Sequence, residues 1–351
     1  MRDREKTIAP RVSVVIPLYQ NGRYIEKAVQ SVLDQTFQDF EIIVVNDGST
    51  DDGPGRVRRF ADPRITVISQ PNGGISKTRN TSFHAARGEY IALLDADDWW
   101  LPEKLQRHVE HLDQNPHVGL SLSASFLVDE HGADLGLVQM PAPGPYTARH
   151  QFCRNPVGNG SAAVIRRTAL DRIKFYDEKR NSFCWFDEDF RRSEDVEFFL
   201  RLSVVGQCEF AAVFEPLTTY RIHPYGLSAN IDGQLSSWLE FRRKVKTFAP
   251  DLEREVGDEA EAYERRYLAR RAVRSKDKVA ARTLMAEALW LSPSIVVREP
   301  AKTLVTMGAV AAMHVLPAKA HTWLEDTVLA LVAAFKRRAT PPVLGSSATG
   351  R

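Results

Sequence analysis

The sequence predicts an α/β fold in which a mostly parallel β-sheet carries helices on both faces and is followed by a helical C-terminal extension. Along the first hundred residues, short apolar runs rich in β-branched residues alternate with amphipathic segments. Such an alternation of strand and helix is typical of a mostly parallel sheet. Beyond about residue 233, the chain consists of charge-striped segments that are typical of helices. These observations predict a sheet region that precedes a helical region.

Several individual elements can be predicted from the spacing of apolar residues. Four nearly continuous apolar runs suit strands that are covered on both faces. These runs are Val12–Ile16, Glu41–Val45, Ile65–Ser69 and Tyr90–Leu94. Apolar residues at spacings of three and four predict helices between the strands. The helices are expected at Tyr24–Leu33 and Gly74–Arg87, with a later strand at Val118–Val128 and a later helix at about Glu194–Val205.

Changes in this pattern divide the chain into four parts. We expect an N-terminal tail over 1–10, an α/β domain over 11–232, a helical extension over 233–338 and a disordered tail over 339–351. The α/β domain is expected to have two halves, 11–115 and 116–232, because the pattern is looser from Pro116 onward.

Composition and charge exclude several classes of protein. The chain has 351 residues, with 47 basic and 45 acidic side chains and a formal net charge of +2. A nucleic-acid-binding protein usually shows a concentrated basic excess, so we expect no nucleic-acid partner. The three cysteines, Cys153, Cys184 and Cys208, lack CxxC spacing, which argues against a disulfide framework or a structural zinc site. The charged N-terminus has no apolar core of a secretory signal, so a cytoplasmic location is expected.

One apolar segment, Thr303–Met313, invites comparison with a membrane span. A helix of its length would be roughly 16 Å long. A bilayer hydrocarbon core is about 30 Å thick. The segment is therefore too short to cross, and a buried helix or an interfacial helix both remain open.

Polar residues cluster after three of the predicted strands, where ligands bind to sheets of this class. The clusters are Pro17–Asn21, Asn46–Asp52 and Asp95–Trp100. Three carboxylates within four positions of the last cluster repel one another unless a cation neutralises them. Oxygen ligands favour Mg²⁺ or Mn²⁺. The alternative is structural, because Asp47, Asp51 and Asp98 are all plausible helix caps or turn residues.

These segments carry a family resemblance. Val12–Asn21, SVLDQTFQDFEIIVVNDGSTDD, NGGISKTRN and GEYIALLDADDWWLPEKL are similar to the family 2 glycosyltransferases, inverting enzymes of the GT-A fold. The resemblance runs from about Arg11 to Leu105 and resumes at Ser193–Asp195 and Tyr220–His223. It implies a nucleotide-sugar-binding half at 11–115 and an acceptor half at 116–232, and leaves the C-terminal third without a counterpart.

The resemblance implies a role for individual side chains in binding the donor. Pro17 and Tyr19 would line the base pocket, with Asp47 hydrogen-bonded to the base and Arg79 reaching the base or the diphosphate. Asp95 would face the ribose or a divalent metal, Mn²⁺ or Mg²⁺, and Asp97 would ligate that metal. The remaining residues implied to contact the diphosphate are Arg221 and His223, with assistance from Ser228.

The resemblance further identifies Asp195 as the catalytic base. A positioned carboxylate that takes the proton of the acceptor hydroxyl typically contributes about 10²–10⁴-fold. The predicted helix would begin here, and a carboxylate is favoured at a helix N-terminus. For the same reason Ser193–Asp195 could be helix-capping residues only. Trp99 and Trp100 could stack on a sugar or pack against the following helix, and His223 could be a metal or phosphate contact or a surface histidine.

The sequence therefore predicts an inverting, hexosyltransferase-type glycosyltransferase with a UDP-sugar as the expected donor. The acceptor would be a sugar or a lipid-linked saccharide, in cell-surface polysaccharide or glycolipid synthesis, with peripheral contact between the C-terminal helices and the cytoplasmic face of a membrane. The alternatives are an inactive nucleotide-sugar-binding protein and a nucleotidyltransferase. A nucleotidyltransferase would normally have a Gly-rich, Lys/Arg-containing loop where this chain has PLYQNGRY, and a Rossmann dehydrogenase would have GxGxxG there. Two departures from the family are Gln20, which replaces its usual Asn, and the stretch NSFCWFDEDFRR, which is expected on the acceptor side.

Overall fold

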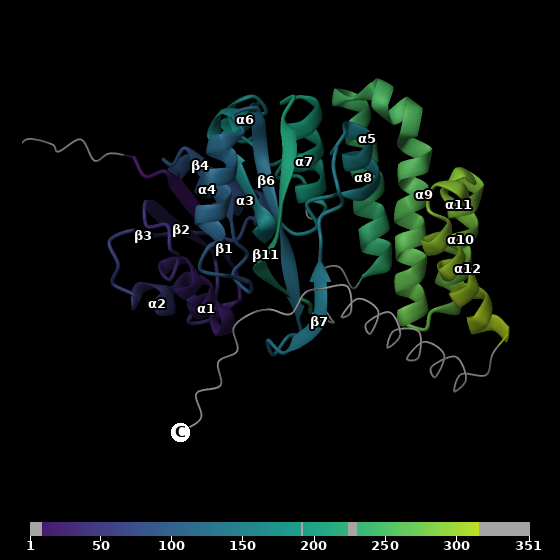
Figure 1. Ribbon diagram of the computed structural model, residues 1–351, viewed down its shortest axis with the longest axis horizontal. Coiled ribbons are helices and arrows are strands. Elements are labelled where there is room, and N and C mark those ends of the chain that lie inside the picture. The colour runs from purple at the N-terminus through teal and green to yellow at the C-terminus, as the bar shows by residue number, and fades with distance from the viewer. Residues whose placement is uncertain (1–8, 191, 224–229, 316–351) are drawn as a thin grey trace, which may run out of the picture.

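The computed structural model describes residues 9–190, 192–223 and 230–315. A twisted sheet with helices on both faces forms one side of the molecule, and a group of long helices forms the other (Figure 1). The predicted order, a sheet region followed by helices, is confirmed.

The first half of the sheet consists of four parallel strands. β1 (Val12–Leu18) lies between β2 (Phe40–Asp47) and β4 (Tyr90–Leu93), and β3 (Ile65–Gln70) pairs with the far side of β2. The connecting helices are α1 (Gly22–Leu33), α2 (Gly53–Arg58) and α3 (Ile75–Ala85). All four predicted strands and both predicted helices of this half are present. The prediction of burial on both faces holds for β1, β2 and β4 but is wrong for β3, because β3 is an edge strand with partly exposed side chains.

The second half of the sheet continues from β4 through an antiparallel strand. β8 (Ala163–Arg166) lies between β4 and β6 (Val118–Val128) and is antiparallel to both. β11 (Glu209–Arg221) pairs parallel to β6, so both run in the direction of β1. The shorter strands β5 (Trp99–Trp100) and β7 (Asp134–Gln139) pair antiparallel with β11 and β6. The sheet is therefore mostly parallel, as predicted, and its carboxyl-end edge continues from β1 to β11.

Short helices and turns complete this part of the molecule. They are α4 (Lys104–Gln114), α5 (Ala148–Arg154), the 3₁₀ turn η1 (Gly160–Ala162), α6 (Arg167–Asp171), α7 (Glu194–Val204) and a hairpin of β9 (Phe175–Asp177) with β10 (Ser182–Cys184).

Alternating side chains of β1 pack into two cores on opposite faces of the sheet. Val14 and Ile16 face α1 and α4, whereas Val15 faces the opposite core, which includes Phe83 of α3 and Phe198 of α7. Full burial of such a side chain contributes about 1.5–3 kcal/mol. Both faces of β1 thus hold the strand in place, and its carboxyl end is a rigid support for the loops that follow.

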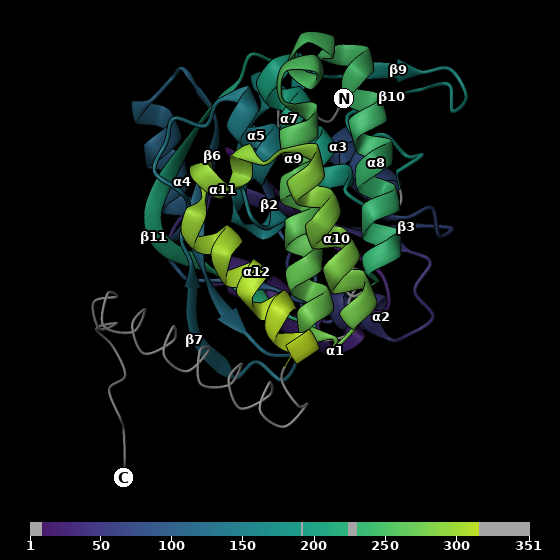
Figure 2. The ribbon, with the colours of Figure 1, turned by 90° about the vertical axis from the view of Figure 1, so that its right-hand side faces the viewer.

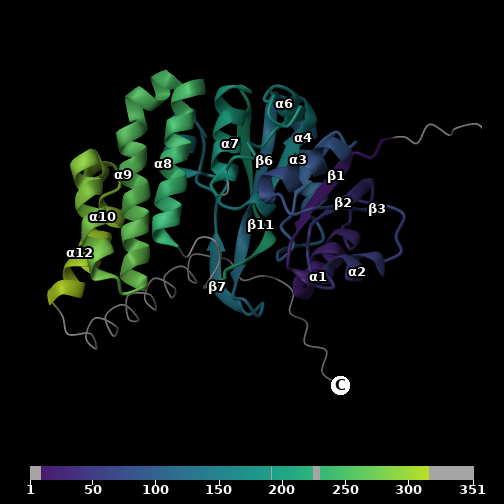
Figure 3. The ribbon, with the colours of Figure 1, turned by 180° about the vertical axis from the view of Figure 1, so that it is seen from behind.

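The helical region begins at α8 (Ile231–Phe248) and continues with α9 (Pro250–Arg274), α10 (Lys278–Leu291), α11 (Ser294–Arg298) and α12 (Pro300–Val315). Viewed from that side, α10 and α12 lie over α9 (Figure 2). Seen from behind, α8 and α9 stand beside α7 (Figure 3). Trp238 and Phe241 of α8 share one core with Phe152 and Leu200, so the helices are packed against the α/β region.

The predicted helical character beyond residue 233 is confirmed through Val315. The predicted division into domains remains a prediction. The tail expected at 339–351 lies outside the described residues, as do 316–338 and most of the N-terminal tail. Throughout the part of the chain described here, no helix is both long enough and apolar enough to cross a bilayer.

Candidate active site

Carboxylates from two elements converge at the carboxyl end of β4. Asp95 and Asp97 follow β4, and Glu194 and Asp195 form the first turn of α7, about a hundred residues later in the chain. Arg79 of α3 joins the two groups. Its Nη1 donates to Glu194 Oε1 at 2.8 Å and its Nη2 donates to Asp95 Oδ1 at 3.2 Å. The structure therefore brings together the predicted metal ligands, the predicted base and the predicted donor-binding arginine.

Arg79 is almost fully buried, at 5% exposure. Burial by itself would lower the pKa of its guanidinium, but Asp95, Glu194 and Asp195 together raise that pKa above its ordinary value. The arginine is thus a permanent cation, and truncation would leave these carboxylates without a partner in a poorly hydrated place.

Asp97 faces His223, which follows β11. His223 Nε2 lies 2.8 Å from Asp97 Oδ2, and the imidazole also packs against the ring of Tyr24. Burial, then the charge of Asp95, raises the pKa of the Asp97 carboxyl, whereas His223 opposes that rise. His223 is therefore a contact of the carboxylate cluster and not an isolated surface histidine.

The third carboxylate, Asp98, is structural. Its side chain is buried and accepts hydrogen bonds from Ser161 Oγ at 2.6 Å and from the backbone N–H of Arg221 at 2.9 Å. Burial, together with the charges of Asp97 and Asp95, raises its pKa well above the ordinary value. Asp98 thus ties the segment after β4 to η1 and β11. This role is structural, but it joins distant segments rather than capping a helix or closing a local turn.

Arg221 was expected to contact the diphosphate, and its guanidinium is engaged elsewhere in this structure. Nε donates to the carbonyl of Asp97 at 2.9 Å, and Nη1 donates to that of Glu130 at 2.9 Å. The same group lies over the rings of Tyr24 and Trp99. These contacts make Arg221 a brace between the carboxylate loop and the β6–β7 turn.

The two tryptophans after the carboxylates have different surroundings. Trp100 is buried in the core that includes Leu105 of α4, and its Nε1 donates to the carbonyl of Ser161 at 2.9 Å. Packing on the following helix is therefore the correct interpretation for Trp100, and stacking on a sugar is wrong. Trp99 is partly exposed, with Lys27 Nζ 3.2 Å from its ring centroid.

The residues expected to bind the nucleotide base differ in their exposure to solvent. Tyr19 is 50% exposed, whereas Pro17 is buried within β1. Asp47 is also buried, and its carboxylate accepts hydrogen bonds from Gln70 Nε2 at 2.8 Å and from the backbone N–H groups of Gly73 and Gly74, each at 2.9 Å. In this structure Asp47 organises the turn that leads into α3 and thereby positions Arg79.

Asp51 caps α1 from a distant loop. Its Oδ2 accepts from the backbone N–H of Gly22, the first residue of α1, at 2.7 Å, and its Oδ1 accepts from that of Gly53 at 3.1 Å. A Cβ on Gly22 would approach both Asp51 and Asp52 at 2.9 Å, which explains why glycine opens this helix.

We expect Asp51→Ala to lower the free energy of unfolding by about 1 kcal/mol, the usual effect of losing a helix cap. Urea denaturation measures this change, with Asp52→Ala as the control, because Asp52 is mainly exposed and bonds only Arg56 through its side chain. Equal stability of Asp51→Ala and the wild type would refute the capping role.

The cluster carries more negative than positive charge. Burial, then the charge of Asp195, raises the pKa of Glu194 to about 7, although Arg79 opposes the rise. Burial likewise raises the pKa of Asp195, and Arg79 limits that rise.

Among the described residues, no three His, Cys, Asp or Glu side chains form a metal site. The carboxylates of Asp95 and Asp97 are oxygen ligands of the kind that Mg²⁺ or Mn²⁺ prefers. Mg²⁺ usually joins one or two carboxylates to substrate phosphates. Asp95 and Asp97 therefore fit a divalent ion whose remaining ligands would come from a bound nucleotide.

Sequence comparison identifies the part of the chain that carries this cluster. The profile of the glycosyl transferase family 2 matches residues 13–174. Residues 13–174 belong to this family. The family 2 region thus includes β1, β2, β4 and the carboxylates that follow β4, while Asp195 and the helices from α8 onward lie beyond the matched residues.

Individual relatives extend the similarity. The putative glycosyltransferase EpsH of Bacillus subtilis is 43% identical over 221 residues, which are 61% of this chain and 61% of EpsH. The chondroitin synthase of Pasteurella multocida is 39% identical over 200 residues, which are 56% of this chain and 19% of that enzyme. The chain therefore spans less than two thirds of the length of either relative.

A solved structure supports the fold. The mannosyltransferase PcManGT from Pyrobaculum calidifontis, solved with GDP-Man and Mn²⁺, matches with a TM-score of 0.55 at 20% identity. The match covers 94% of this chain and 88% of that chain. The fold is thus of the GT-A type, and the structural match extends into the helical C-terminal part.

Three contributors to this site were not predicted. Glu194 was considered only as a capping residue, although its position beside Asp195 was a usable signal. Ser161 donates to Asp98 and accepts from the backbone N–H of Asp95 at 3.0 Å, and no sequence pattern points to it. Gly160 lies against the ion pair, since a Cβ there would be 3.4 Å from Arg79 Nη2. Ser228, which was expected to assist, lies outside the described residues.

Proposed function

We propose that the chain is an inverting glycosyltransferase of the hexosyltransferase type, which transfers a sugar from a nucleotide-diphosphate sugar to an acceptor hydroxyl. The observation that carries this proposal is the link through Arg79 between the carboxylates after β4 and the first turn of α7. That link supports the proposal, because groups that would stabilise the leaving diphosphate would then lie beside a carboxylate that would accept the proton of the attacking hydroxyl. The expected donor is a UDP-sugar.

Asp97 and Asp95 would hold the divalent ion, Mg²⁺ or Mn²⁺. When bound, such an ion neutralises charge that develops on the departing nucleoside diphosphate. His223 would lie close to the same oxygens and could add positive charge when protonated. Tyr19, Pro17 and Asp47 would form or support the pocket for the nucleotide base. Arg221 would hold the carboxylate loop in place through its hydrogen bonds to the carbonyls of Asp97 and Glu130.

Asp195 would act as the general base. The acceptor oxygen attacks the anomeric carbon from the face opposite the phosphate and gives its proton to the carboxylate. The bond between the anomeric carbon and the phosphate oxygen breaks, and the nucleoside diphosphate leaves with that oxygen. Arg79 is a positioning residue in this scheme. Its hydrogen bonds hold Glu194, the neighbour of Asp195, and Asp95, which would face the donor.

The acceptor we propose is a sugar or a lipid-linked saccharide in cell-surface polysaccharide or glycolipid synthesis. The similarity to a chondroitin synthase over 200 residues supports a saccharide acceptor. Lipid-linked saccharides are found at the surface of a bilayer, so the C-terminal helices would make peripheral contact with the cytoplasmic face of the membrane.

The outer helices have an apolar surface that suits this contact. On α12, Leu304 and Val305 are 54% and 62% exposed, whereas Thr303 and Thr306 are buried. The polarity of the first turns of this helix is thus inverted relative to an ordinary surface helix, whereas Val310 and Met313 further along it are buried. Trp290 of α10 is also strongly exposed. Lys302 is the only Lys, Arg, Asp or Glu residue of α12, so this helix has no negative charge that would repel anionic lipid.

We expect a Leu304→Gln/Val305→Gln double variant to bind phosphatidylglycerol-containing vesicles at least about tenfold more weakly than the wild type, because two apolar side chains are lost from the contact. Co-sedimentation with vesicles measures the partition. Phe214→Gln is the matched control, since Phe214 is 54% exposed on β11, away from these helices. Equal partition of the double variant and the wild type would show that another surface, or none, meets the membrane.

The experiment that tests the proposed function measures binding and slow hydrolysis of a panel of nucleotide sugars with Mn²⁺, Mg²⁺ or EDTA. Metal-dependent binding of one donor, with hydrolysis, supports the transferase. Binding without turnover under any condition would favour the inactive binding protein. Cleavage between the phosphates, with release of a nucleoside monophosphate, would favour the nucleotidyltransferase.

A further inference from the structure

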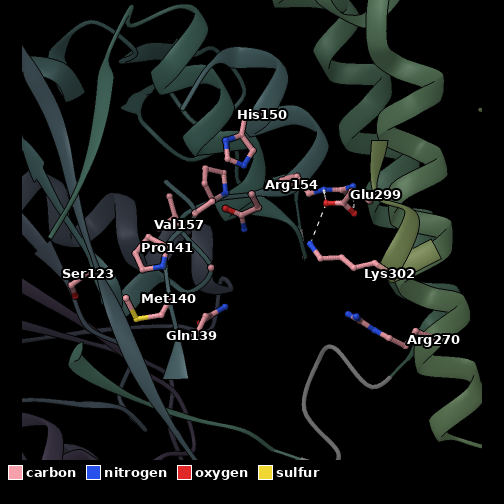
Figure 4. A pocket seen from close by; sticks show the side chains of 14 residues that line it. Ser123, Gln139, Met140, Pro141, His150, Arg154, Val157, Arg270, Glu299 and Lys302 are labelled. Atoms are coloured by element: carbon pink, nitrogen blue, oxygen red, sulfur yellow. Dashed lines mark hydrogen bonds and ion pairs between the residues drawn. The ribbon is translucent and has the colours of Figure 1, made fainter. Parts of the chain in front are cut away.

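A cavity of about 480 Å³ lies between the α/β region and the C-terminal helices (Figure 4). One wall is formed by the segments that follow β7 and α5, from Gln139 to Ala142 and from Arg154 to Gly158. The other wall is formed by Arg270 of α9, by Glu299 and by Lys302 of α12. This volume is within the range of small-molecule sites.

The charge balance of the cavity is positive. Among the described residues that line it, Glu299 is the only acid, and it is shared by several cations. Arg154 Nη2 lies 2.8 Å from Glu299 Oε2, Lys302 Nζ lies 3.1 Å from Oε1, and Arg266 donates to the same carboxylate. Burial opposes its ionisation, but these partners lower the pKa of Glu299 to about 2. One negative charge therefore faces several fixed positive charges.

Arg270 in particular has no directly bonded anionic partner among the described residues, although the charge of Glu299 acts on it at longer range. It makes no hydrogen bond or ion pair with any residue in the described part of the chain, and its guanidinium lies 5.7 Å from the ring of Tyr267. Partial burial and the neighbouring Arg274 lower its pKa. In Figure 4 its guanidinium points into the cavity beside the ammonium of Lys302. Two cationic groups thus face a common space that holds one carboxylate.

The cavity also offers an acceptor for a hydroxyl group. The side-chain oxygen of Asn155 is buried and has no hydrogen-bond partner among the described residues. A buried carbonyl oxygen without a donor is costly, and this one is shielded from solvent, so a bound hydroxyl would satisfy it only after a local shift of the side chains that cover it. Cations together with a waiting acceptor are suited to a molecule that bears both an anionic group and hydroxyl groups.

The wall of the cavity continues to the candidate active site. Gly158 lines the cavity, and Gly160, two residues later, lies against the pair of Arg79 and Asp95. Asn159 between them is buried and donates to Ser125 Oγ and to Gln139 Oε1, each at 3.0 Å. A ligand in the cavity would therefore be bounded by the same rigid segment that borders the carboxylate cluster.

We propose that this cavity binds the anionic group of the acceptor, a phosphate or a carboxylate, while the acceptor hydroxyl extends past Gly158 toward Asp195. The assignment rests on the proposed function. Arg270 and Lys302 would bind the anion through charge-assisted hydrogen bonds, and Asn155 would accept from a neighbouring hydroxyl. The acceptor would then be an acidic saccharide or a saccharide linked through phosphate.

The test measures binding of inorganic phosphate and of glucuronate to the full-length protein by line broadening of the ligand NMR signals. UDP and Mg²⁺ are present at saturation, so that the donor site is filled. We expect saturable binding to the wild type and binding about tenfold weaker or worse in an Arg270→Ala/Lys302→Ala variant. Arg282→Ala is the control, because Arg282 is an exposed cation of α10 that does not line the cavity.

The two ligands distinguish the sources of the anion. Tighter binding of phosphate would indicate a phosphate-linked acceptor, tighter binding of glucuronate would indicate an acidic saccharide, and either result supports the cavity. No saturable binding to the wild type, or equal binding to the double variant, would overturn the assignment. Donor hydrolysis measured on the same proteins separates the two proposals: hydrolysis without anion binding rejects only the cavity, whereas no hydrolysis with any donor rejects the transferase.

Discussion

Replacement of Asp195 by Asn is expected to lower the transfer rate by about 10²–10⁴-fold, the contribution that a positioned general base typically makes. The amide has nearly the shape of the carboxylate but cannot take a proton from the acceptor hydroxyl. Asp195 lies in the first turn of α7. Its neighbour Glu194, and not Asp195 itself, accepts the hydrogen bond from Arg79 Nη1. Binding of the nucleotide sugar should therefore persist while turnover is lost. Initial rates of transfer, together with equilibrium binding of the donor, measure this separation.

The pH dependence of the wild type gives a second readout of the same assignment. Burial raises the pKa of Asp195 above its ordinary value, and Glu194 beside it has a pKa of about 7. Because the base must be deprotonated to act, the rate should fall as the pH falls through the raised pKa, at a higher pH than an ordinary aspartate would cause. The residual activity of Asp195→Asn should lack this acid limb.

A matched control is Asp171→Asn at the end of α6, where the carboxylate is exposed. Its rate and pH profile should equal those of the wild type. If Asp195→Asn also retained the wild-type rate, the base would have to be sought elsewhere, and Glu194 would be the first candidate.

The strands that the sequence predicted best are those with an unambiguous local pattern. VSVVI and its counterparts in β2 and β4 are apolar on both faces, and they are central strands of the sheet. β8 was not predicted because it is four residues long and its place between β4 and β6 depends on pairing with distant strands. β3 (ITVISQ) is also rich in β-branched apolar residues, but such a short run does not by itself distinguish an edge strand from a central one.

The candidate site divides in a similar way. The family resemblance selected Asp95, Asp97 and Asp195. In the structure Arg79 contacts Asp95 and is influenced by the charge of Asp195, whereas Asp97 faces His223. Hydrogen bonds from distant backbone groups could not be foreseen. The amides of Gly73 and Gly74 engage Asp47, and carbonyls engage Arg221, because the folded loops pass there. Sequence spacing identifies which side chains reach an edge of the sheet, but it does not reveal which of them the local backbone already occupies.

Replacement of Asp97 by Ala is expected to abolish the metal dependence of donor binding and to lower the transfer rate by about 10²–10³-fold, the scale for loss of one group that stabilises a developing negative charge. Asp97 would be a ligand of the ion, and in the variant His223 would lose its partner at 2.8 Å. Treatment of the wild type with EDTA should cause a comparable loss that Mn²⁺ or Mg²⁺ restores, whereas neither ion should restore Asp97→Ala. Titration of the donor with and without metal measures both effects.

The same substitution should leave the fold intact, which separates a functional effect from a structural one. Burial and the charge of Asp95 disfavour ionised Asp97, as its raised pKa indicates, so removal of this carboxylate relieves repulsion within the cluster. The midpoint of thermal unfolding should therefore stay equal to that of the wild type or rise, as is usual where a site is strained for function. Asp251→Ala is the control for a general loss of charge, because Asp251 is 90% exposed at the start of α9. A variant that lost both stability and activity would indicate that Asp97 holds the loop rather than a metal, and the role of the carboxylate pair after β4 would then rest on Asp95 alone.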